Sequence, residues 1–452
     1  MKKISIIGLG FVGMPTFLTL SNIKNKSKYT YEVEGIEKAD SKGERIKRYF
    51  NEKKNWIPTK DKIFKNYFDI ASKRKDVYIN TNLNSIFKSK IVIVSVNFDF
   101  QSLNNNYFDN LKRLSKDIAS RIKKNTLVIF ETTLPPGATD KIIIPEFKKS
   151  LKKRKMKIDD IYLCYSFERV MPGENYINSI ISNYRCFSGI NDSSKNSCKK
   201  FLKSFIKHKR FKLTEFDKII ECETAKILEN SYRASNIAFI DEWTKASKTL
   251  KINLNKVIEA IKLRPTHSNM MWPGLGVGGY CLTKDPSFIQ FSFKNFFKKK
   301  NTFPIIRNTL NINNKMVNTS FELIKDHTSL NNKNILICGI SYKENTSDLR
   351  FSPSLQLIEI LKNKNSKISI FDPYHNTGIG NLKKFKFIKT LNKRYDIIIF
   401  CVNHKEFKKI NFLKSKLSKQ VIIFDLNRVL TIKQKKSLIK KKIKFHQIGN
   451  YL

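Results

Sequence analysis

A glycine pattern near the start of the chain restricts the possible folds more than any other segment. Residues 3–7 form a short β-rich run, followed at once by G-L-G-F-V-G and then by an apolar helical pattern through Leu20. A dinucleotide pyrophosphate requires this order of strand, tight turn and helix, since the glycines allow a sharp turn, close approach to phosphate and close packing of helix on strand. Free N–H groups at the helix start would face the phosphates. The sequence therefore predicts a dinucleotide site formed by Gly8, Gly10, Phe11, Val12 and Gly13.

The acidic residue after the next predicted strand indicates which dinucleotide binds. Residues 31–36 form that strand, and it ends at Glu37. A carboxylate in this place can accept a hydrogen bond from the ribose 2′-hydroxyl, which favours NAD over NADP. Lys38 beside it is compatible with a phosphate as well, and a glycine-rich turn without a ligand is the alternative. We expect NAD as the cofactor.

Further β-rich runs alternate with helical or polar connectors and predict a parallel, doubly wound sheet. The runs are residues 77–79, 91–96, 126–129 and 161–165. E-T-T-L-P-P-G (131–137) and S-F-E-R-V-M-P-G (166–173) follow two of them, where ligands bind in open α/β sheets. Thr132 and Thr133 are candidates either for the site or for capping the turn. Glu168 and Arg169 are candidates either for the site or for a surface ion pair.

A long helix is predicted from about Phe216 onward. Glu223, Lys226 and Asn230 are spaced by three and four residues, so they share one helical face. Periodicity alone favours a solvated, salt-bridged stripe over a catalytic face. A helix of this length between two domains often carries a dimer contact.

The segment P-G-L-G-V-G-G-Y-C-L-T-K-D-P (273–286) places Cys281 among four glycines within six positions. Glycines free the backbone to approach a ligand, and a thiol on such a segment can reach a substrate. A neighbouring cation such as Lys284 would favour the reactive thiolate, and Asp285 could hold a proton or a water. A glycine-rich surface turn with an inert cysteine is the alternative.

A second β-rich unit follows a helical connector at residues 309–330. It opens with N-I-L-I-C-G-I-S-Y-K (334–343) and continues E-N-T-S-D-L-R-F-S-P, with further strand candidates at residues 367–371, 397–402 and 421–424. Gly339 follows a strand without the full dinucleotide pattern, so a nucleotide-like ligand is expected there. Lys343 and Arg350 suit its phosphates, or are ordinary surface charges.

Composition narrows the class of protein. A chain of 452 residues with 40% hydrophobic content is long enough for two or three globular domains. Its 87 Lys and Arg against 38 acidic residues give a formal charge of +49, but the basic residues are scattered through every segment, so no nucleic-acid partner is expected. Seven cysteines without C-x-x-C spacing indicate neither a disulfide framework nor a metal site. With no long apolar run, we expect a cytoplasmic protein without a membrane partner.

In order along the chain, these motifs resemble the nucleotide-sugar 6-dehydrogenase family, which includes the UDP-glucose and GDP-mannose dehydrogenases and their N-acetylhexosamine relatives. E-T-A-K-I-L-E-N-S-Y-R (223–233) and F-D-P (371–373) add to the resemblance. It implies an α/β fold with two Rossmann-like doubly wound parallel-sheet domains, joined by a long central helix and a helical dimerisation region. The implied domains are an NAD-binding domain (1–206), a central domain with the cysteine segment (207–305) and a UDP-sugar-binding domain (306–452). A homodimer or higher homo-oligomer is expected.

The resemblance also implies an activity and the residues for it. The family oxidises the C6 alcohol of a UDP-sugar to a carboxylate with two NAD⁺, through a thiohemiacetal and a thioester on a cysteine that corresponds to Cys281. Lys226 and Asn230 match the pair that stabilises oxyanion charge, and Glu168 matches the carboxylate for thioester hydrolysis. Asp285 and Thr133 match residues that position water or manage protons, the latter beside the cofactor. The implied substrate-binding residues are Glu168, Arg169, Lys226, Asn230, Arg264 (reaching across a dimer), Gly278, Lys343 and Arg350.

Two positions depart from the family pattern. Tyr280 stands before the nucleophile, where relatives commonly have histidine or serine, and Pro172 replaces a glutamate of the UDP-glucose branch. The loop around Glu168 and Arg169 looks more like that of the N-acetylhexosamine branch. The alternative functions are an NAD or nucleotide-sugar binding protein that has lost turnover and, resting on the +49 charge, a nucleic-acid binder.

Overall fold

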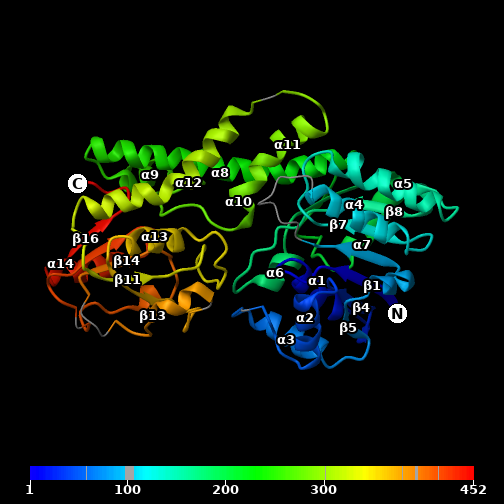
Figure 1. Cartoon of the computed structure of the whole chain (residues 1–452), viewed down its shortest axis with the longest axis horizontal. Helices are drawn as coiled ribbons and strands as arrows, with labels where there is room; N and C mark the ends of the chain where they lie inside the picture. The colour runs from blue at the N-terminus through cyan, green and yellow to red at the C-terminus, as the bar shows by residue number, and fades with distance from the viewer. Residues whose placement is uncertain (58, 97–105, 301, 379, 392–394, 416) are drawn as a thin grey trace. The chain divides into compact units, whose positions relative to one another are not determined.

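The computed structural model describes residues 1–57, 59–96, 106–300, 302–378, 380–391, 395–415 and 417–452, with the backbone alone at 106 and 107. The chain divides into two compact units. Unit 1 comprises Met1–Leu228 and Phe288–Asn301, and unit 2 comprises Glu229–Ser287 and Thr302–Leu452. Figure 1 labels the elements of both units.

An eight-stranded sheet forms the centre of unit 1 within the described residues. Its spatial order is β10 (Leu213–Glu215), β9 (Arg185–Gly189), β8 (Tyr162–Tyr165), β7 (Leu127–Phe130), β6 (Ile91–Val94), β1 (Lys2–Ile7), β4 (Tyr31–Ile36) and β5 (Val77–Asn80). Neighbouring strands are parallel except β8 and β9, which are antiparallel. From β5 to β8 the strands follow the order 3-2-1-4-5-6 of a dinucleotide-binding sheet. The predicted parallel doubly wound sheet is confirmed, with the antiparallel pair as a correction.

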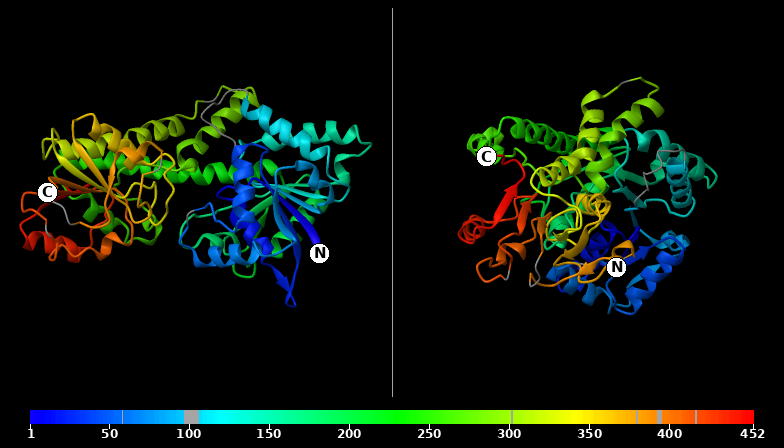
Figure 2. Two further views of the ribbon diagram at one scale, coloured as in Figure 1. Left: turned by 60° about the horizontal axis from the view of Figure 1, so that its bottom comes forward. Right: turned by 60° about the vertical axis from the view of Figure 1, so that its left-hand side comes forward.

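Helices cover both faces of this sheet, as Figures 1 and 2 show. One face packs against α1, α2, α3, α6 and α7, and the other against α4, α5 and the start of α8. The bounds are α1 (Gly13–Ser21), α2 (Ser41–Asn51), α3 (Lys62–Ala71), η1 (Leu83–Lys88), α4 (Asn106–Ala119), η2 (Thr139–Ile143), α5 (Ile144–Lys152), η3 (Ile158–Asp160), α6 (Tyr176–Ile181), α7 (Asp192–Lys203), α8 (Ile219–Thr249) and α11 (Phe288–Asn295), with a hairpin of β2 (Lys24–Asn25) and β3 (Lys28–Tyr29). Because helices shield both faces of the sheet from water, central strands such as β6 consist entirely of apolar residues.

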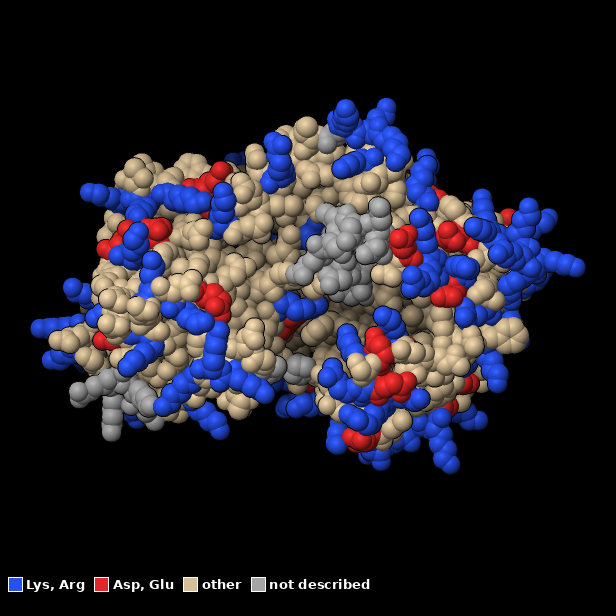
Figure 3. Space-filling view, viewed as in Figure 1, with Lys and Arg blue, Asp and Glu red and all other residues tan. Residues whose placement is uncertain are grey.

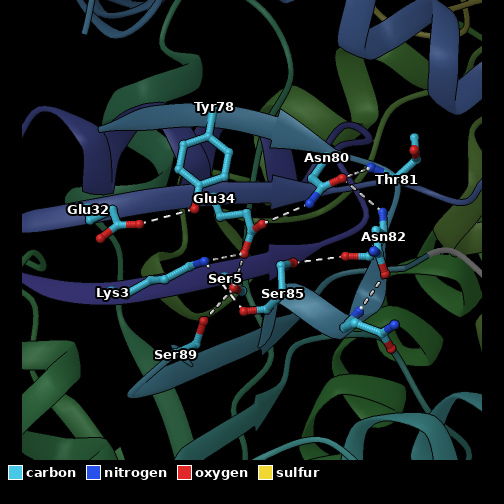
Figure 4. Close-up of polar contacts among 11 residues, drawn as sticks. Lys3, Ser5, Glu32, Glu34, Tyr78, Asn80, Thr81, Asn82, Ser85 and Ser89 are labelled. Atoms are coloured by element: carbon cyan, nitrogen blue, oxygen red, sulfur yellow. Dashed lines mark hydrogen bonds and ion pairs between the residues drawn. The ribbon is translucent and has the colours of Figure 1, made fainter. Parts of the chain in front are cut away.

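A buried polar cluster interrupts this core between β1, β4, β5 and η1 (Figure 4). Lys3 lies 3.1 Å from the carboxylate of Glu34, whose side chain is fully buried. Ser5 donates to the same carboxylate at 2.9 Å, and Asn80 donates to its other oxygen at 3.3 Å. Lys3 also donates to the backbone carbonyl of Ser85 in η1 at 3.4 Å, so the cluster joins β1, β4 and β5 to η1.

Unit 2 contains a six-stranded, wholly parallel sheet among its described residues. Its order is β13 (Lys386–Phe387), β12 (Lys367–Phe371), β11 (Asn334–Cys338), β14 (Ile397–Phe400), β15 (Ile422–Asp425) and β16 (Lys444–Gln447). This again is the order 3-2-1-4-5-6. The predicted second Rossmann-like domain is therefore confirmed.

One face of the second sheet packs against α12 and α13, and the other against α14. The remaining part of α8 and α9 continue the unit as a helical layer. The bounds are α9 (Leu254–Ile261), η4 (Pro265–His267), α10 (Tyr280–Lys284), η5 (Asp285–Ser287), α12 (Pro304–Lys325), α13 (Pro353–Lys362), η6 (Gly380–Lys384), η7 (Phe407–Lys409) and α14 (Ile432–Lys440).

The basic residues do not gather over one element on the face drawn in Figure 3. Lys and Arg are spread over both units there, with Asp and Glu between them. The scatter seen in the sequence is thus also a scatter on this surface, which does not form the single basic stripe of a nucleic-acid groove.

Candidate active site

The turn after β1 has the geometry that the glycine pattern predicts. Gly8 has φ +90°, and a Cβ atom on Gly13 would lie 1.8 Å from the carbonyl oxygen of Gly8. Only glycine therefore allows α1 to begin this close to β1. A Cβ atom on Gly10 would meet nothing within 4 Å, so the turn leaves open space before the start of α1. These residues fit a dinucleotide pyrophosphate, which N–H groups at a helix start bind.

Glu37 closes this turn from the end of the neighbouring strand. Its Oε1 accepts a hydrogen bond of 2.5 Å from the N–H of Leu9, and the side chain is half-buried. Lys38 is 85% exposed and lies 3.9 Å from Asp40, its carboxylate neighbour. The carboxylate of Glu37 therefore lies at the strand end where a dinucleotide fold binds the ribose. Lys38 instead lies near the carboxylate of Asp40.

An ion pair that the sequence did not reveal lies under the 131–137 loop. Arg185 pairs with Glu131, and both side chains are almost fully buried. Ser95 donates to the second oxygen of Glu131 at 3.0 Å. Burial raises the pKa of Glu131, although Arg185 favours the ionised form. In the loop itself, Thr132 donates to the carbonyl of Val96 at 2.8 Å and so links the loop to the segment after β6, whereas Thr133 is half-buried.

Glu223 of α8 holds the far end of the same loop. Its Oε2 accepts from the N–H of Gly137 at 2.6 Å, and its Oε1 accepts from the N–H and the hydroxyl of Thr139 at 2.9 and 2.7 Å. Burial raises the pKa of Glu223 to about 7, against the effect of these donors. The residue is fully buried, and so are Lys226 and Asn230 at 7% and 2% exposure. The solvated stripe that periodicity favoured is therefore wrong.

Lys226 and Glu168 meet within unit 1. The Nζ of Lys226 donates to the backbone carbonyl of Glu168 at 2.9 Å and lies 5.4 Å from the ring centre of Phe167. The carboxylate of Glu168 accepts from the N–H of Val170. Arg169 donates to the carbonyl of Tyr184 at 2.7 Å. The ammonium group is thus a buried donor held in place by the loop after β8.

Cys281 lies in the short helix α10 and is exposed, whereas the six other cysteines are buried. The glycines before it are needed for close approach. A Cβ atom on Gly278 would lie 2.7 Å from both the carbonyl oxygen of Phe351 and the Cβ of Tyr342. On Gly279, where φ is +79°, it would lie 2.7 Å from the ring of Tyr342. Tight packing on residues 342–351, rather than the expected backbone flexibility, accounts for these glycines.

Asn230 and Asp285 form a buried polar pair in unit 2. The side-chain amide of Asn230 donates to Oδ2 of Asp285 at 2.7 Å, and Asp285 is 1% exposed. The Nζ of Lys284 lies 3.1 Å from the other oxygen of Asp285. Lys284 is therefore engaged with Asp285, and the pair stands one helical turn after Cys281.

The turn after β11 repeats the turn after β1. Gly339 has φ +91°, and Asp372, which follows β12, accepts from the N–H of Ile340 at 2.7 Å as Glu37 does from Leu9. Unlike Glu37, Asp372 is buried and also accepts from the N–H of Tyr374 at 2.7 Å. Burial would raise the pKa of Asp372, but His404 and these backbone donors hold it below the ordinary value. Both oxygens of Asp372 are therefore engaged by backbone donors within unit 2.

The loop after this turn is anchored by a buried histidine that the sequence did not single out. Nδ1 of His404 accepts from the N–H of Asn345 at 2.9 Å, so its Nε2 carries the hydrogen, 3.1 Å from the hydroxyl of Ser341. On the same loop, Lys343 is half-buried, and Arg350 binds Asp348 through Nε at 2.9 Å. No local pattern marks His404, because its partners lie about sixty residues away.

The last predicted substrate residue, Arg264, is exposed between α9 and η4. In the part of the chain that the structure describes, no group of three or more His, Cys, Asp or Glu side chains is arranged to hold a metal ion.

Comparison with known families accounts for this arrangement along almost the whole chain. Residues 2–206 match the NAD binding domain of the UDP-glucose/GDP-mannose dehydrogenase family, residues 221–315 its central domain and residues 336–432 its UDP binding domain. The chain belongs to the UDP-glucose/GDP-mannose dehydrogenase family.

Similar members of the family come from archaea. The chain is 28% identical over 418 residues to a UDP-N-acetyl-D-mannosamine dehydrogenase of Pyrococcus horikoshii, covering 91% of each chain. It is 33% identical over 329 residues to an enzyme of the same name from Methanococcus aeolicus, covering 70% of this chain and 68% of the relative. A solved UDP-D-ManNAc dehydrogenase of Pyrococcus horikoshii superimposes with a TM-score of 0.77 at 25% identity, covering 99% of each chain.

Membership in the UDP-glucose/GDP-mannose dehydrogenase family confirms the predicted class. The chain is an NAD-dependent oxidoreductase that acts on a UDP-sugar. The turn after β1 lies within the matched NAD binding domain, and the turn after β11 within the matched UDP binding domain. Among the described helices, none is long and apolar enough to cross a membrane.

Proposed function

We propose that this dehydrogenase oxidises the C6 alcohol of a UDP-N-acetylhexosamine to the uronic acid, for the supply of polysaccharide precursors. The names of the similar relatives, UDP-N-acetyl-D-mannosamine dehydrogenases, support N-acetylmannosamine as the sugar. The sequence S-F-E-R-V-M-P-G around Glu168 also favours the N-acetylhexosamine branch. A UDP-hexose without the acetamido group is the second candidate.

The exposed thiol of Cys281 is the observation that carries the proposed mechanism. The first oxidation converts the C6 alcohol to an aldehyde, and the Cys281 thiolate adds to it to give a thiohemiacetal. The second oxidation gives a thioester, which water hydrolyses to the carboxylate and the free thiol. NAD⁺, when bound at the turn of Gly8, Gly10 and Gly13, accepts one hydride in each oxidation. One sugar and one water therefore yield one carboxylate and two NADH.

Buried donors support an oxyanion role for Lys226 and Asn230. Neither side chain has to be ordered during the reaction, because both are already held by protein contacts. We propose that Asp285, the partner of Asn230, manages protons at the thiol, and that Glu168 acts as the base in thioester hydrolysis. Thr133 would position water beside the cofactor.

In this proposal, NAD binds at the turn after β1, and residues of several segments contact the UDP-sugar. Phe11, Val12 and Glu37 would join the three glycines in holding NAD. The proposed contacts for the UDP-sugar are Arg169, Arg264, Gly278, Lys343 and Arg350. The proposed boundaries of the NAD, central and UDP-sugar domains are 1–206, 207–305 and 306–452.

The substrate assignment is tested with a panel of UDP-N-acetylmannosamine, UDP-N-acetylglucosamine, UDP-glucose and GDP-mannose. We expect NADH absorbance to rise with the first sugar and to reach two NADH per uronate formed. One NADH per sugar, or no NADH with any of them, would contradict the four-electron oxidation.

The nucleophile is tested by replacing Cys281 with serine. We expect uronate formation to fall at least about a hundredfold, because a serine hydroxyl is a far weaker nucleophile than a thiolate near neutral pH. Binding of NAD, followed by its effect on the melting temperature, should be unchanged and serves as the control. Uronate formation at the wild-type rate would contradict the assignment of Cys281 as the nucleophile.

A further inference from the structure

Tyr280, which departs from the family pattern, has a defined environment in unit 2. Its ring lies 5.3 Å from that of Phe351 at an interplanar angle of 75°. The guanidinium carbon of Arg350 lies 5.2 Å from the ring centre of Tyr280, within the range of a cation–π interaction. The Nζ of Lys284 lies 5.3 Å from the same ring. Tyr280 therefore contacts two cations and an aromatic ring at once.

Arg350 is the better fixed of the two cations. Its Nε lies 2.9 and 3.0 Å from the two oxygens of Asp348, and its Nη2 lies 2.5 Å from one of them. Asp348 is 4% exposed, whereas the side chain of Arg350 is 34% exposed, so water is excluded from the carboxylate but not from the whole guanidinium. A forked guanidinium–carboxylate contact of this kind has one preferred geometry.

The backbone of Arg350 also contacts the glycine segment that precedes Cys281. Its carbonyl accepts from the N–H of Gly279 at 3.0 Å, so one residue contacts both Gly279 and the ring of Tyr280. The Cβ clearances at Gly278 and Gly279 show that nothing larger than glycine fits between this segment and Tyr342. The start of α10, and with it Cys281, is thus held against residues 342–351 by packing, a backbone hydrogen bond and a cation–π contact.

Arg350 contacts both residues that directly precede the thiol, Gly279 through its carbonyl and Tyr280 through its guanidinium. Burial lowers the pKa of Arg350, but Asp348 and, to a smaller extent, Tyr342 and Cys281 raise it above the ordinary value. Lys284, the cation nearest in sequence, is engaged with the buried carboxylate of Asp285. The guanidinium is therefore a positive charge held against Tyr280, the residue directly before Cys281.

We propose that Tyr280 and Arg350 are positioning residues for Cys281: the Arg350 guanidinium, oriented by Asp348 and covered by the Tyr280 ring, holds α10 in place and favours the thiolate of Cys281. The inference rests on the proposed function for the use of that thiolate in turnover. At the position where relatives commonly have histidine or serine, Tyr280 gives this cation an aromatic face to contact.

The test is the rate of alkylation of the full-length protein by iodoacetamide, measured from pH 6 to 10. Because Cys281 is the exposed cysteine, alkylation of the folded protein reports on it, and peptide mass analysis confirms the site. Tyr280→Leu keeps an apolar contact with Phe351 but removes the aromatic face. We expect it to slow alkylation at pH 7 by about threefold to tenfold and to move the midpoint of the pH profile upward. Tyr280→Phe, the matched control, should keep the wild-type profile.

A second variant removes the charge itself. Asp348→Asn with Arg350→Met deletes both members of the ion pair, so that no buried carboxylate is orphaned. We expect the same upward shift in midpoint, and no larger shift when Tyr280→Leu is added, because both changes remove one interaction. Lys284→Met should shift the midpoint less. A wild-type profile in both the Tyr280→Leu and the Asp348→Asn/Arg350→Met proteins, or a larger shift in Lys284→Met, would overturn the proposal.

The alkylation assay uses neither NAD nor sugar, so it separates this proposal from the proposed function. If Cys281→Ser still formed uronate, the mechanism would fail while the alkylation profiles stayed informative about Tyr280 and Arg350. If the profiles were unaltered but Cys281→Ser were inactive, the positioning role alone would fail.

Discussion

At the scale of single residues, the spacing of three polar side chains on α8 did not show whether they are solvated or buried, and the structure shows that they are buried. Glu223, Lys226 and Asn230 share one face of α8, as their spacing predicts, but the face is buried instead of solvated. Glu223 accepts three hydrogen bonds from the loop at Gly137 and Thr139. Its function is therefore to hold that loop on α8, a role that no periodicity indicates.

We expect Glu223→Gln to destabilise unit 1 by about 1–3 kcal/mol although the side chains are nearly isosteric. The amide group of glutamine would face an N–H or hydroxyl donor of Gly137 or Thr139, leaving a buried donor without an acceptor. Chemical denaturation of the full chain measures the change. Glu221→Gln, at an exposed position on the same helix, is the control. Equal stability of the two variants would contradict the role of Glu223 in holding the loop on α8.

The same residue makes stability depend on pH. Its pKa is raised from 4.5 to about 7 on folding, so between these values the folded chain holds a proton that the unfolded chain releases. The contribution of Glu223 to the free energy of unfolding is therefore complete below about pH 4.5 and is lost as the pH rises to about 7. The stability gap between wild type and Glu223→Gln should narrow from pH 5 to pH 8, and a gap that widened would refute the raised pKa.

At the scale of elements, the strands of unit 1 combine an apolar pattern with one polar cluster. Lys3 of β1 and Glu34 of β4 are 9% and 0% exposed, and Ser5, Asn80 and η1 complete their surroundings (Figure 4). Lys3 also donates to the carbonyl of Ser85 in the 3-10 helix η1 at 3.4 Å, so the polar cluster joins the strands to this helix.

Replacing only one residue of the Lys3–Glu34 ion pair should destabilise the protein more than replacing both residues with apolar ones. We expect Glu34→Leu alone to destabilise the protein by about 3–5 kcal/mol, because it leaves the Lys3 ammonium buried and unpaired. Adding Lys3→Met should recover most of that loss, since buried pairs are often matched by apolar residues of similar size. A double-mutant cycle on urea unfolding of the full chain measures both effects. A double variant no more stable than Glu34→Leu would show that the ion pair is not the cause.

At the scale of the whole molecule, we propose that an apolar stripe on α8 forms the interface of the expected homodimer or higher homo-oligomer. Tyr232, Phe239 and Trp243 are 59%, 50% and 45% exposed, and their spacing places them along one side of the helix. Met270 and Met271 line a pocket together with Tyr232 and Phe239. Exposed aromatic residues of this kind are typical of interfaces between protein chains.

We expect Trp243→Glu to weaken self-association at least tenfold, because a charge at the centre of an apolar contact is desolvated without a partner. Sedimentation velocity across a concentration series measures it. Ile432→Glu, a matched change at an exposed apolar position on α14, should leave association unchanged. A monomeric wild-type protein, or equal effects of both changes, would contradict an interface on α8.

Much of the fold followed from the order of residues along the chain. The strand at residues 31–36 and the strand at residues 367–371 were predicted with the bounds that the structure has, and the turn at Gly8 has the predicted strand, turn and helix. These features depend on neighbours in sequence: apolar runs, glycine at a positive φ and helical spacing. Strands β9, β10 and β16 were missed, because their sequences R-C-F-S-G, L-T-E and K-F-H-Q lack the apolar run that marks the equally short β6.

Folding in three dimensions decided the rest, because the deciding partners are far apart in sequence. Arg185 meets Glu131, His404 holds Asn345, and Arg350 covers Tyr280, across 54 to 70 residues. Sequence placed Cys281 among glycines but did not show that those glycines pack on Tyr342, nor which cation lies near the thiol. Local patterns specify strands, turns and helices through short-range sterics and hydrogen bonds. The environment of a reactive group depends on which surfaces the folded chain brings together.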